Sequence, residues 1–520
     1  MEEKNIVDYD DVSVKAPLTS SEKTINPRMQ YHFGRKVIKI PLSERNLNEV
    51  TIQKYLPFVL SIHAKNASEC YHFEKVYTGN SNIFDKERKI NPDKKNSIVN
   101  ENHAYYMVEF KKGYMYGEPI KYSCVDDSVS TDDISYLNKY MIDQKKASKD
   151  IEMGEAIFKC GNAYRMVIPK GYDKSMNLDK ESPFKIVNLD NKTTFVVYSS
   201  HFEKEKLFAG IITTIDSLNP NETNYEVMIY TKKHSYRYKC HSLTPTWDSL
   251  DFISKREHYL EHIPIVEYYT NTARLGVIDV VETVLDAINY MSSDSVDNVN
   301  DFVNSILAIY NMIVDDQTQK EIEAYKSLSL KTTDPNRPAD AKYLVNAMNQ
   351  ADVMVKYEAL LKVAYNIVGV PQPTTKTTSG GDTGDARELG GGWNSADIVA
   401  KQNEEPLKQG EYILLDLILN ICRKMPNCKV DELYPCDIDI NFNRTNRDNL
   451  MAKTQALTYL YDRHLPLETI LNITNLCSNS HEVALAWQEN IEAKQKEESE
   501  RTKLLQQDQQ NIDKNDNEGS

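Results

Sequence analysis

The chain has 520 residues, 40% hydrophobic and 27% charged, a balance typical of a globular protein with a sizeable core. That length is enough for about three domains. No run of about 18 apolar residues occurs, so we expect no membrane-spanning helix. The acidic, polar start MEEKNIVDYD lacks the pattern of a secretory signal. The formal net charge of −15 argues against a tight DNA-binding protein, because such proteins usually carry a basic surplus.

The first half of the chain has the pattern of a mixed α+β region. Residues 1–45 show few periodic apolar positions and are expected to be a loose arm. Helical periodicity follows over 48–67 and again over 139–161. Residues 163–168 and the stretch 183–243 contain short apolar runs between turn residues, which predict strands.

Two long amphipathic helices are predicted in the second half, over about 277–300 and 349–368. On the first, the apolar stripe is Val277, Val281, Val284 and Ile288, with Ile278 and Leu285 beside it. Asp279, Glu282 and Asp286 lie on its other face. On the second, the stripe is Val353, Tyr357, Leu360, Leu361, Ala364, Ile367 and Val368. Between the two helices we expect a strand over 305–310 and then a short helix over 316–328.

The segment 371–393 holds six of the 18 glycines and has no apolar periodicity, so it is predicted to be a long mobile loop. A third long helix over 394–425 contains Pro406, which removes a backbone donor and should kink it. A strand is expected over 436–442. Helices follow at about 448–462, 466–476 and 481–498, and the polar tail after about 496 is expected to be disordered.

Motifs for chemistry are weak. His258-x-x-Glu261-His262 matches the inverted zinc-protease signature, but Pro264 follows at once and leaves little room for the required helix. The glycine-rich loop contains no Gly-Lys-Ser/Thr, so it is not a phosphate-binding P-loop. Asp437 and Asp439 alternate with isoleucines and are interpreted as the solvated face of a strand. The eight cysteines do not have the spacing of a zinc site. We therefore expect no enzyme activity, no metal and no cofactor.

Three stretches occur in an order and spacing typical of one family. The most specific runs from His262 through the strand IPIVEYY to Asn271, then Arg274, then LDAIN at 285–289 and Ser293-Asp294. The others are 96–122 and Cys160-Gly-Asn-Ala-Tyr164. From about 48 to 498 the chain resembles portal proteins of tailed phages that infect Gram-positive bacteria. Gly276-Val277-Ile278-Asp279 departs from the family's Gly-Asp-Phe-Glu-like start of the first stem helix.

The resemblance implies an α+β portal fold in a dodecameric ring at one capsid vertex. Its parts would be an N-terminal arm (1–45), wing (46–270), stem helix 1 (271–300), clip (301–345), stem helix 2 (346–370), tunnel loop (371–393), kinked helix and wing return strand (394–445), α-helical crown (446–495) and disordered tail (496–520). The amphipathic pattern of the two long helices agrees with this architecture, because neighbouring subunits of a closed ring could bury the flanks of each stem helix. Twelve acidic chains would also repel the phosphates of a moving duplex.

The implied function is a channel for double-stranded DNA, used in genome packaging, head–tail joining and ejection. Implied partners are the terminase large subunit, which hydrolyses ATP, the head-completion adaptor, and the major capsid and scaffolding proteins. The protein would assemble in the host cytoplasm and reside in the virion. The candidate tunnel-loop residues are Lys376, Thr377, Thr378, Gly380, Gly381, Asp382, Gly384, Arg387, Gly390, Gly391 and Gly392. Contact of Lys376 and Arg387 with phosphates is one hypothesis, and plain solvation is the other. The rival functions are a zinc metalloprotease and a non-viral scaffold protein.

Overall fold

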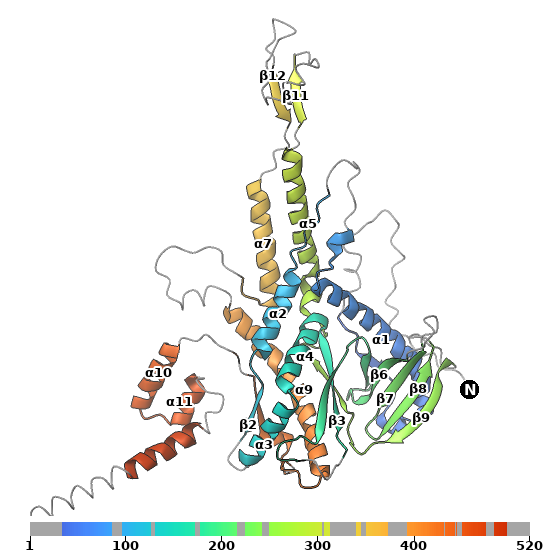
Figure 1. The fold of residues 1–520 in the computed structure, drawn as a ribbon, viewed down its shortest axis with the longest axis vertical. Helices are drawn as coiled ribbons and strands as arrows, with labels where there is room; N and C mark the ends of the chain where they lie inside the picture. The colour runs from blue at the N-terminus through green and yellow to red at the C-terminus, as the bar shows by residue number, and fades with distance from the viewer. Residues whose placement is uncertain are drawn as a thin grey trace, which may run out of the picture.

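The computed structural model describes residues 34–85, 96–125, 131–171, 177–215, 224–241, 249–303, 306–311, 340–344, 350–372, 393–430, 432–442, 444, 450–474 and 483–496. Two long helices rise from a mixed body of helices and sheets, and a short pair of strands lies beyond their far end (Figure 1). The expected α+β class is confirmed.

The body contains a six-stranded sheet in the order β1-β5-β6-β7-β8-β9. Its strands are β1 (Ile38–Ile40), β5 (Thr194–Ser199), β6 (Lys206–Ile215), β7 (Asn224–Tyr230), β8 (His234–Cys240) and β9 (Asp251–Glu257). All neighbours are antiparallel except β1, which pairs parallel with β5. Helix α1 (Glu49–Tyr77) covers this sheet through Ile52, Leu56, Val59 and Leu60, which share one apolar core with it.

A second, three-stranded sheet connects the body to the long helices. Its order is β10-β3-β4, with β3 (Asn162–Pro169), β4 (Phe184–Leu189) and β10 (Ile265–Tyr269) antiparallel throughout. Helices α2 (His103–Tyr116), α3 (Thr131–Asp143), α4 (Lys146–Cys160) and α9 (Trp393–Lys424) share the largest apolar core with this sheet. A small pair of strands, β2 (Lys121–Cys124) and β13 (Ile438–Asn441), joins distant parts of the chain beside α3.

The two long helices are α5 (Val277–Val303) and α7 (Gln350–Val368), which lie side by side (Figure 1). Between them in sequence, β11 (Ile306–Tyr310) and β12 (Asp340–Leu344) form an antiparallel pair. The expected short helix over 316–328 lies outside the described residues. Towards the C-terminus, α10 (Leu450–Asp462) and α11 (Leu467–Thr474) are followed by a helix over 483–496. Short 3₁₀ turns are η2 (Glu44–Asn46), η3 (Asn82–Asp85) and η5 (Pro435–Asp437).

Three expectations about the first half need correction. The arm was expected to be loose to residue 45, but β1 belongs to the six-stranded sheet. The helix expected over 48–67 continues to Tyr77, because Cys70, Phe73 and Val76 extend its buried stripe. The helix expected over 139–161 is two helices, since Lys145 takes a left-handed conformation (φ 51°) between α3 and α4. The strands predicted over 163–168 and within 183–243 are confirmed.

Candidate functional site

The interface between α5 and α7 is built from the predicted apolar stripes. Val277, Val281 and Ile288 of α5 are buried, and Val284 is half-buried against the same core. On α7, Ala364 and Val368 are buried, whereas Val353 is half-buried. The half-buried α7 residues that pack against the core are Tyr357, Leu360 and Leu361. Ile367 was expected in this stripe but is 51% exposed, because it lies on a flank of α7 rather than against α5.

The acidic face of α5 is buried as well. Asp279 accepts a hydrogen bond from Arg35 at 2.6 Å and another from the Gly276 N–H at 2.6 Å, which caps the start of the helix. Asp286 accepts from Asn82 of η3 at 2.9 Å, and Glu282 contacts His72 of α1. Sequence periodicity separated this face from the apolar stripe correctly. It did not show that α1 and η3 cover it.

Residues 97–101 run along the same helix as an extended strap. The N–H groups of Ser97, Val99 and Glu101 donate to Asp297 Oδ1, Ser293 Oγ and Asn289 Oδ1 at 2.8, 2.9 and 3.1 Å. Every second strap residue therefore meets every fourth helix residue. The match is geometric, because two extended residues advance about 6.6 Å and four helical residues about 6.0 Å. We call this set of three contacts the strap ladder.

Glu101 joins the strap to both long helices. Its carboxylate accepts hydrogen bonds from Ser292 of α5 and Tyr357 of α7, and it pairs with His103 at 2.7 Å. Burial acts to raise the pKa of Glu101, but the hydrogen bonds from His103, Ser292 and Tyr357 outweigh it and lower that pKa to about 2. Glu101 is therefore a charged residue that links the strap to both long helices.

Aromatic side chains gather where α7 ends and α9 begins. Trp393, the first residue of α9, lies 5.7 Å from Phe110 and 6.2 Å from Tyr114 between ring centroids, and those two rings of α2 stack on each other. Beside them, burial lowers the pKa of Lys111 to about 8. This cluster fixes one end of the segment that connects the two helices.

A buried ion cluster holds α9 to the body. Glu411 of α9 accepts a hydrogen bond from Tyr122 at 2.8 Å and pairs with Lys146 at 3.1 Å. Lys146 and Arg165 both pair with Asp150, each at 2.8 Å. All four charged side chains are at most 4% exposed. Two cations and two anions compensate one another there, as buried charges require.

The predicted tunnel loop and the predicted helix kink both stay predictions. The candidate residues from Lys376 to Gly392 lie outside the described residues, so their roles stay predictions. Pro406 lies inside α9, which remains helical on both sides of it, and the kink there also stays a prediction. The strand predicted over 436–442 is present as the shorter β13, and it pairs antiparallel with β2.

A family model matches most of the chain. The family model for "Phage portal protein, SPP1 Gp6-like" matches residues 56–497. The chain belongs to this portal family. The match begins within α1 and extends to the end of the helix over 483–496, so it includes the helix pair, the strap and α9. No curated protein matched the chain.

Portal membership leaves the zinc-protease motif unexplained, and its geometry does not support that chemistry. Residues 258–262 form a loop between β9 and β10, where Glu261 has a φ of 60°. His258 Nε2 contacts the Thr231 carbonyl at 2.9 Å, and His262 lies 3.5 Å from Asp416. Within the described ranges, no group of three or more His, Cys, Asp or Glu is arranged to hold a metal ion. The helix that would align the two histidines is absent from this described loop, so the geometry of residues 258–262 does not support the zinc-protease alternative.

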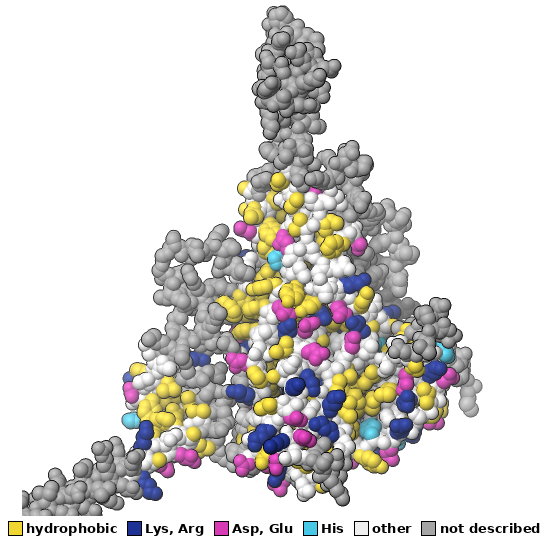
Figure 2. Space-filling model, in the orientation of Figure 1, with side chains coloured by type: hydrophobic (Ala, Val, Ile, Leu, Met, Phe, Trp, Pro, Cys, Tyr) yellow, Lys and Arg dark blue, Asp and Glu magenta, His cyan; other side chains and the backbone are white. Residues whose placement is uncertain are grey.

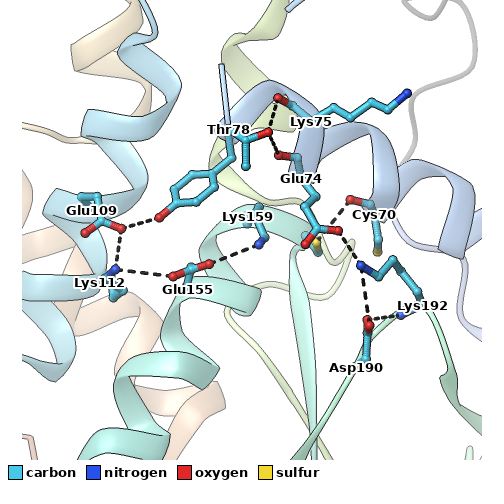
Figure 3. Close-up of polar contacts among 12 residues, drawn as sticks. Cys70, Glu74, Lys75, Thr78, Glu109, Lys112, Glu155, Lys159, Asp190 and Lys192 are labelled. Atoms are coloured by element: carbon cyan, nitrogen blue, oxygen red, sulfur yellow. Dashed lines mark hydrogen bonds and ion pairs between the residues drawn. The ribbon is translucent and has the colours of Figure 1, made fainter. Parts of the chain in front are cut away.

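The portal chain also contains a polar cavity that sequence reasoning missed. It has a volume of about 350 Å³ and lies between α1, α4 and the β4–β5 turn. Figure 3 shows Glu74 of α1 facing Lys192 and Asp190 of that turn, and Glu155 of α4 between Lys112 and Lys159. Cys70 lies at the same place. No helix in the described part of the portal chain has the length and apolarity to cross a membrane.

Some residues whose partners were not predicted did leave a signal in the sequence. Asp286, Asn289 and Ser293 fall within the stretch that carried the resemblance to portal proteins. Their spacing of three and four residues is that of one helical face, and Glu282 and Asp297 extend it. A polar stripe of that length on an otherwise apolar helix indicates a buried polar partner. The partner itself, the strap about 190 residues earlier, could not be identified from the pattern.

Proposed function

We propose that this portal-family protein assembles into a dodecameric ring at one capsid vertex and that double-stranded DNA passes through the ring during packaging and ejection. In this assignment α5 and α7 form the stem, β11 and β12 belong to the clip, and α10 and α11 belong to the crown. The terminase large subunit and later the head-completion adaptor would bind the clip. The major capsid and scaffolding proteins would surround the wing. The siphophage type and a Gram-positive host are part of the same proposal.

The observation that carries the proposal is the apolar surface left uncovered on the stem. On α7, Val355 is 66%, Met354 58% and Ile367 51% exposed, and Val296 and Val299 of α5 are also exposed. Figure 2 shows hydrophobic side chains gathered along this part of the molecule. Large exposed apolar surfaces mark interaction sites. Neighbouring copies would bury these flanks, and a head-to-tail contact that closes produces a ring.

The charge of the chain supports passage rather than tight binding of DNA. A ring of chains with net charge −15 repels phosphate on average, so a duplex inside it would meet little adhesion. The segment 371–393 would line the narrowest part of the channel, with Lys376 and Arg387 as its transient phosphate contacts. ATP hydrolysis belongs to the terminase in this proposal, which agrees with the missing P-loop sequence.

Two experiments test the proposal at different levels. Negative-stain imaging and native mass spectrometry of the full chain should show closed rings, and a monomer at every concentration would overturn the ring. Deletion of residues 376–388 should leave ring assembly intact and abolish DNA packaging or retention. Normal infectious particles from that deletion would overturn the role of the loop while leaving the ring standing.

A further inference from the structure

Two cysteines from distant parts of the chain meet beside the polar cavity. Cys70 lies on α1 and Cys160 is the last residue of α4, and both line the cavity although each is less than 5% exposed. The Cys160 thiol lies 3.9 Å from the Cys70 carbonyl oxygen, so the two residues are direct neighbours at the wall of the cavity. Both thiols are therefore buried in the protein but border a cavity that is large enough to hold small molecules.

Arg35 places a buried positive charge near this pair of cysteines. Its side chain is 1% exposed, and its Nη2 atom pairs with Asp279 at 2.6 Å and with Glu69 at 2.9 Å. Its Nε and Nη1 atoms are buried and have no hydrogen-bond partner among the described residues. Arg35 lies close enough to Cys70 to interact with its sulfur. A thiolate at Cys70 would therefore supply an acceptor for donors that are costly to leave unsatisfied.

The two sulfurs are chemically unequal. The hydrogen bond from Cys160 lowers the pKa of Cys70; burial acts in the opposite direction, and the charge of Arg35 adds to the lowering. The same thiol contact raises the pKa of Cys160, and burial raises it further. Arg35 pairs with Glu69, the residue directly before Cys70, so its positive charge lies on the Cys70 side of the pair and favours Cys70 as the nucleophile. Cys160 is then the resolving thiol.

We propose that Cys70 and Cys160 form a peroxide-sensitive pair that closes to a disulfide between α1 and the end of α4. The Cys70 thiolate attacks one oxygen of hydrogen peroxide, the O–O bond breaks, and hydroxide leaves, so Cys70 becomes a sulfenic acid. The Cys160 sulfur then attacks Cys70, the S–O bond breaks, and the departing hydroxide takes the Cys160 proton as water. Two thiols are oxidised and one peroxide is reduced. A cavity of about 350 Å³ admits this oxidant, which is close to water in size.

The disulfide would lie next to the start of α5, where that helix leaves the body of the protein. Gly161 follows Cys160 directly, and a Cβ atom at Gly161 would lie 2.0 Å from the Arg274 carbonyl oxygen. Gly276, just before α5, also packs closely on the Lys159 carbonyl oxygen, which would lie 2.6 Å from a Cβ atom added at Gly276. Joining α1 to this junction would restrain the body where it meets the stem. The proposal concerns the folded chain and does not depend on ring formation.

The test is oxidation of the reduced, full-length protein with hydrogen peroxide, followed by differential alkylation and peptide mass spectrometry. We expect equal loss of the Cys70 and Cys160 thiols and a peptide crosslinked between them. Cys240, which is buried in the core of the six-stranded sheet, should keep its thiol and serves as the internal control. Alkylation of Cys70 and Cys160 as free thiols after exposed Cys436 has been oxidised would overturn the proposal. So would a crosslink that forms only in urea.

Two variants separate the roles of the thiols. In Cys160→Ser the sulfenic acid at Cys70 should persist and be trapped by dimedone. In Cys70→Ser, Cys160 should give no adduct under the same conditions. Adducts of equal yield in both variants would overturn the assignment of Cys70 as the nucleophile. If either variant does not fold, the crosslink in the unaltered protein still decides whether the pair exists.

Discussion

The backbone N–H of Val99 donates to Ser293 Oγ at 2.9 Å, and this bond is the middle contact of the strap ladder. Ser293 is fully buried on α5 and also bonds the Asn289 carbonyl at 2.7 Å. The ladder thus holds the extended segment 97–101 against α5 through backbone N–H groups that have no partner in a sheet.

Ser293→Ala should destabilise the protein by about 1–3 kcal/mol, because it leaves the half-buried Val99 N–H without its acceptor on a fully buried side chain. The free energy of unfolding in urea measures the effect. Ser295→Ala on the same helix, at a half-buried position, is the matched control and should change the free energy by less than about 0.5 kcal/mol. Equal effects of the two substitutions would show that the ladder contributes nothing.

Glu411→Gln should lower the free energy of unfolding by about 3–5 kcal/mol, which is a larger loss than that expected for Ser293→Ala. The substitution removes one of two anions from the buried cluster and leaves Lys146 and Arg165 facing Asp150 alone. The same measurement applies, with Glu405→Gln as the control, because Glu405 is exposed on the same helix. A loss below about 1 kcal/mol would contradict the prediction, because it would show that the two cations do not need the Glu411 charge.

Two glycine substitutions are expected to have opposite signs. A Cβ at Gly154 of α4 would lie 2.4 Å from Tyr116 Cδ2, and the Tyr116 ring is buried, so Gly154→Ala should destabilise by about 1–3 kcal/mol. Gly113 of α2 has open space around its added Cβ, so Gly113→Ala should stabilise by about 0.5–1 kcal/mol. Thermal unfolding of both variants checks the signs. Stabilisation by Gly154→Ala would show that Tyr116 moves aside freely.

Local sequence patterns predicted the helices α5 and α7 but few of their contacts. Stripes such as Val277-Val281-Ile288 repeat at helical spacing, so α5 and α7 could be placed from sequence. The extension of α1 was missed because Lys65, Asn66, Ser68 and Glu69 interrupt the apolar pattern just before Cys70.

Long-range polar contacts were not predictable in the same way. Glu101 meets Ser292 and Tyr357 only because the chain returns to the same place 191 and 256 residues later. Nothing in the residues around Glu101 encodes these partners. The prediction that the Gly-rich segment 371–393 is a loop that contacts DNA concerns an assembly, which the sequence of one chain does not specify.

The strap should also make stability depend on pH below 5. The pKa of Glu101 is about 2 in the folded protein against 4.5 as its ordinary value. A depressed carboxyl pKa contributes stability above the unfolded-state value, and that stability is lost as pH falls from about 4.5 towards 2. After allowance for partial exposure the loss is about 1–2 kcal/mol. Urea unfolding of Glu101→Gln between pH 5 and 3 should show a shallower slope than the unaltered protein. Glu358→Gln, at an exposed position on α7, should leave the slope unchanged.

Assembly should depend on the uncovered flank of α7. Ile367→Lys puts a charge on a side chain that is 51% exposed in one chain, so the monomer should fold while the proposed contact with a neighbouring copy is lost. Ile142→Lys on α3 is the matched control, because Ile142 is 76% exposed and lies far from the stem. Native mass spectrometry should show rings for the control and monomers for Ile367→Lys, with similar circular dichroism. Rings from Ile367→Lys at the yield of the unaltered protein would place the subunit contact elsewhere on the stem, because a buried, unpaired lysine cannot be accommodated at an apolar interface without cost.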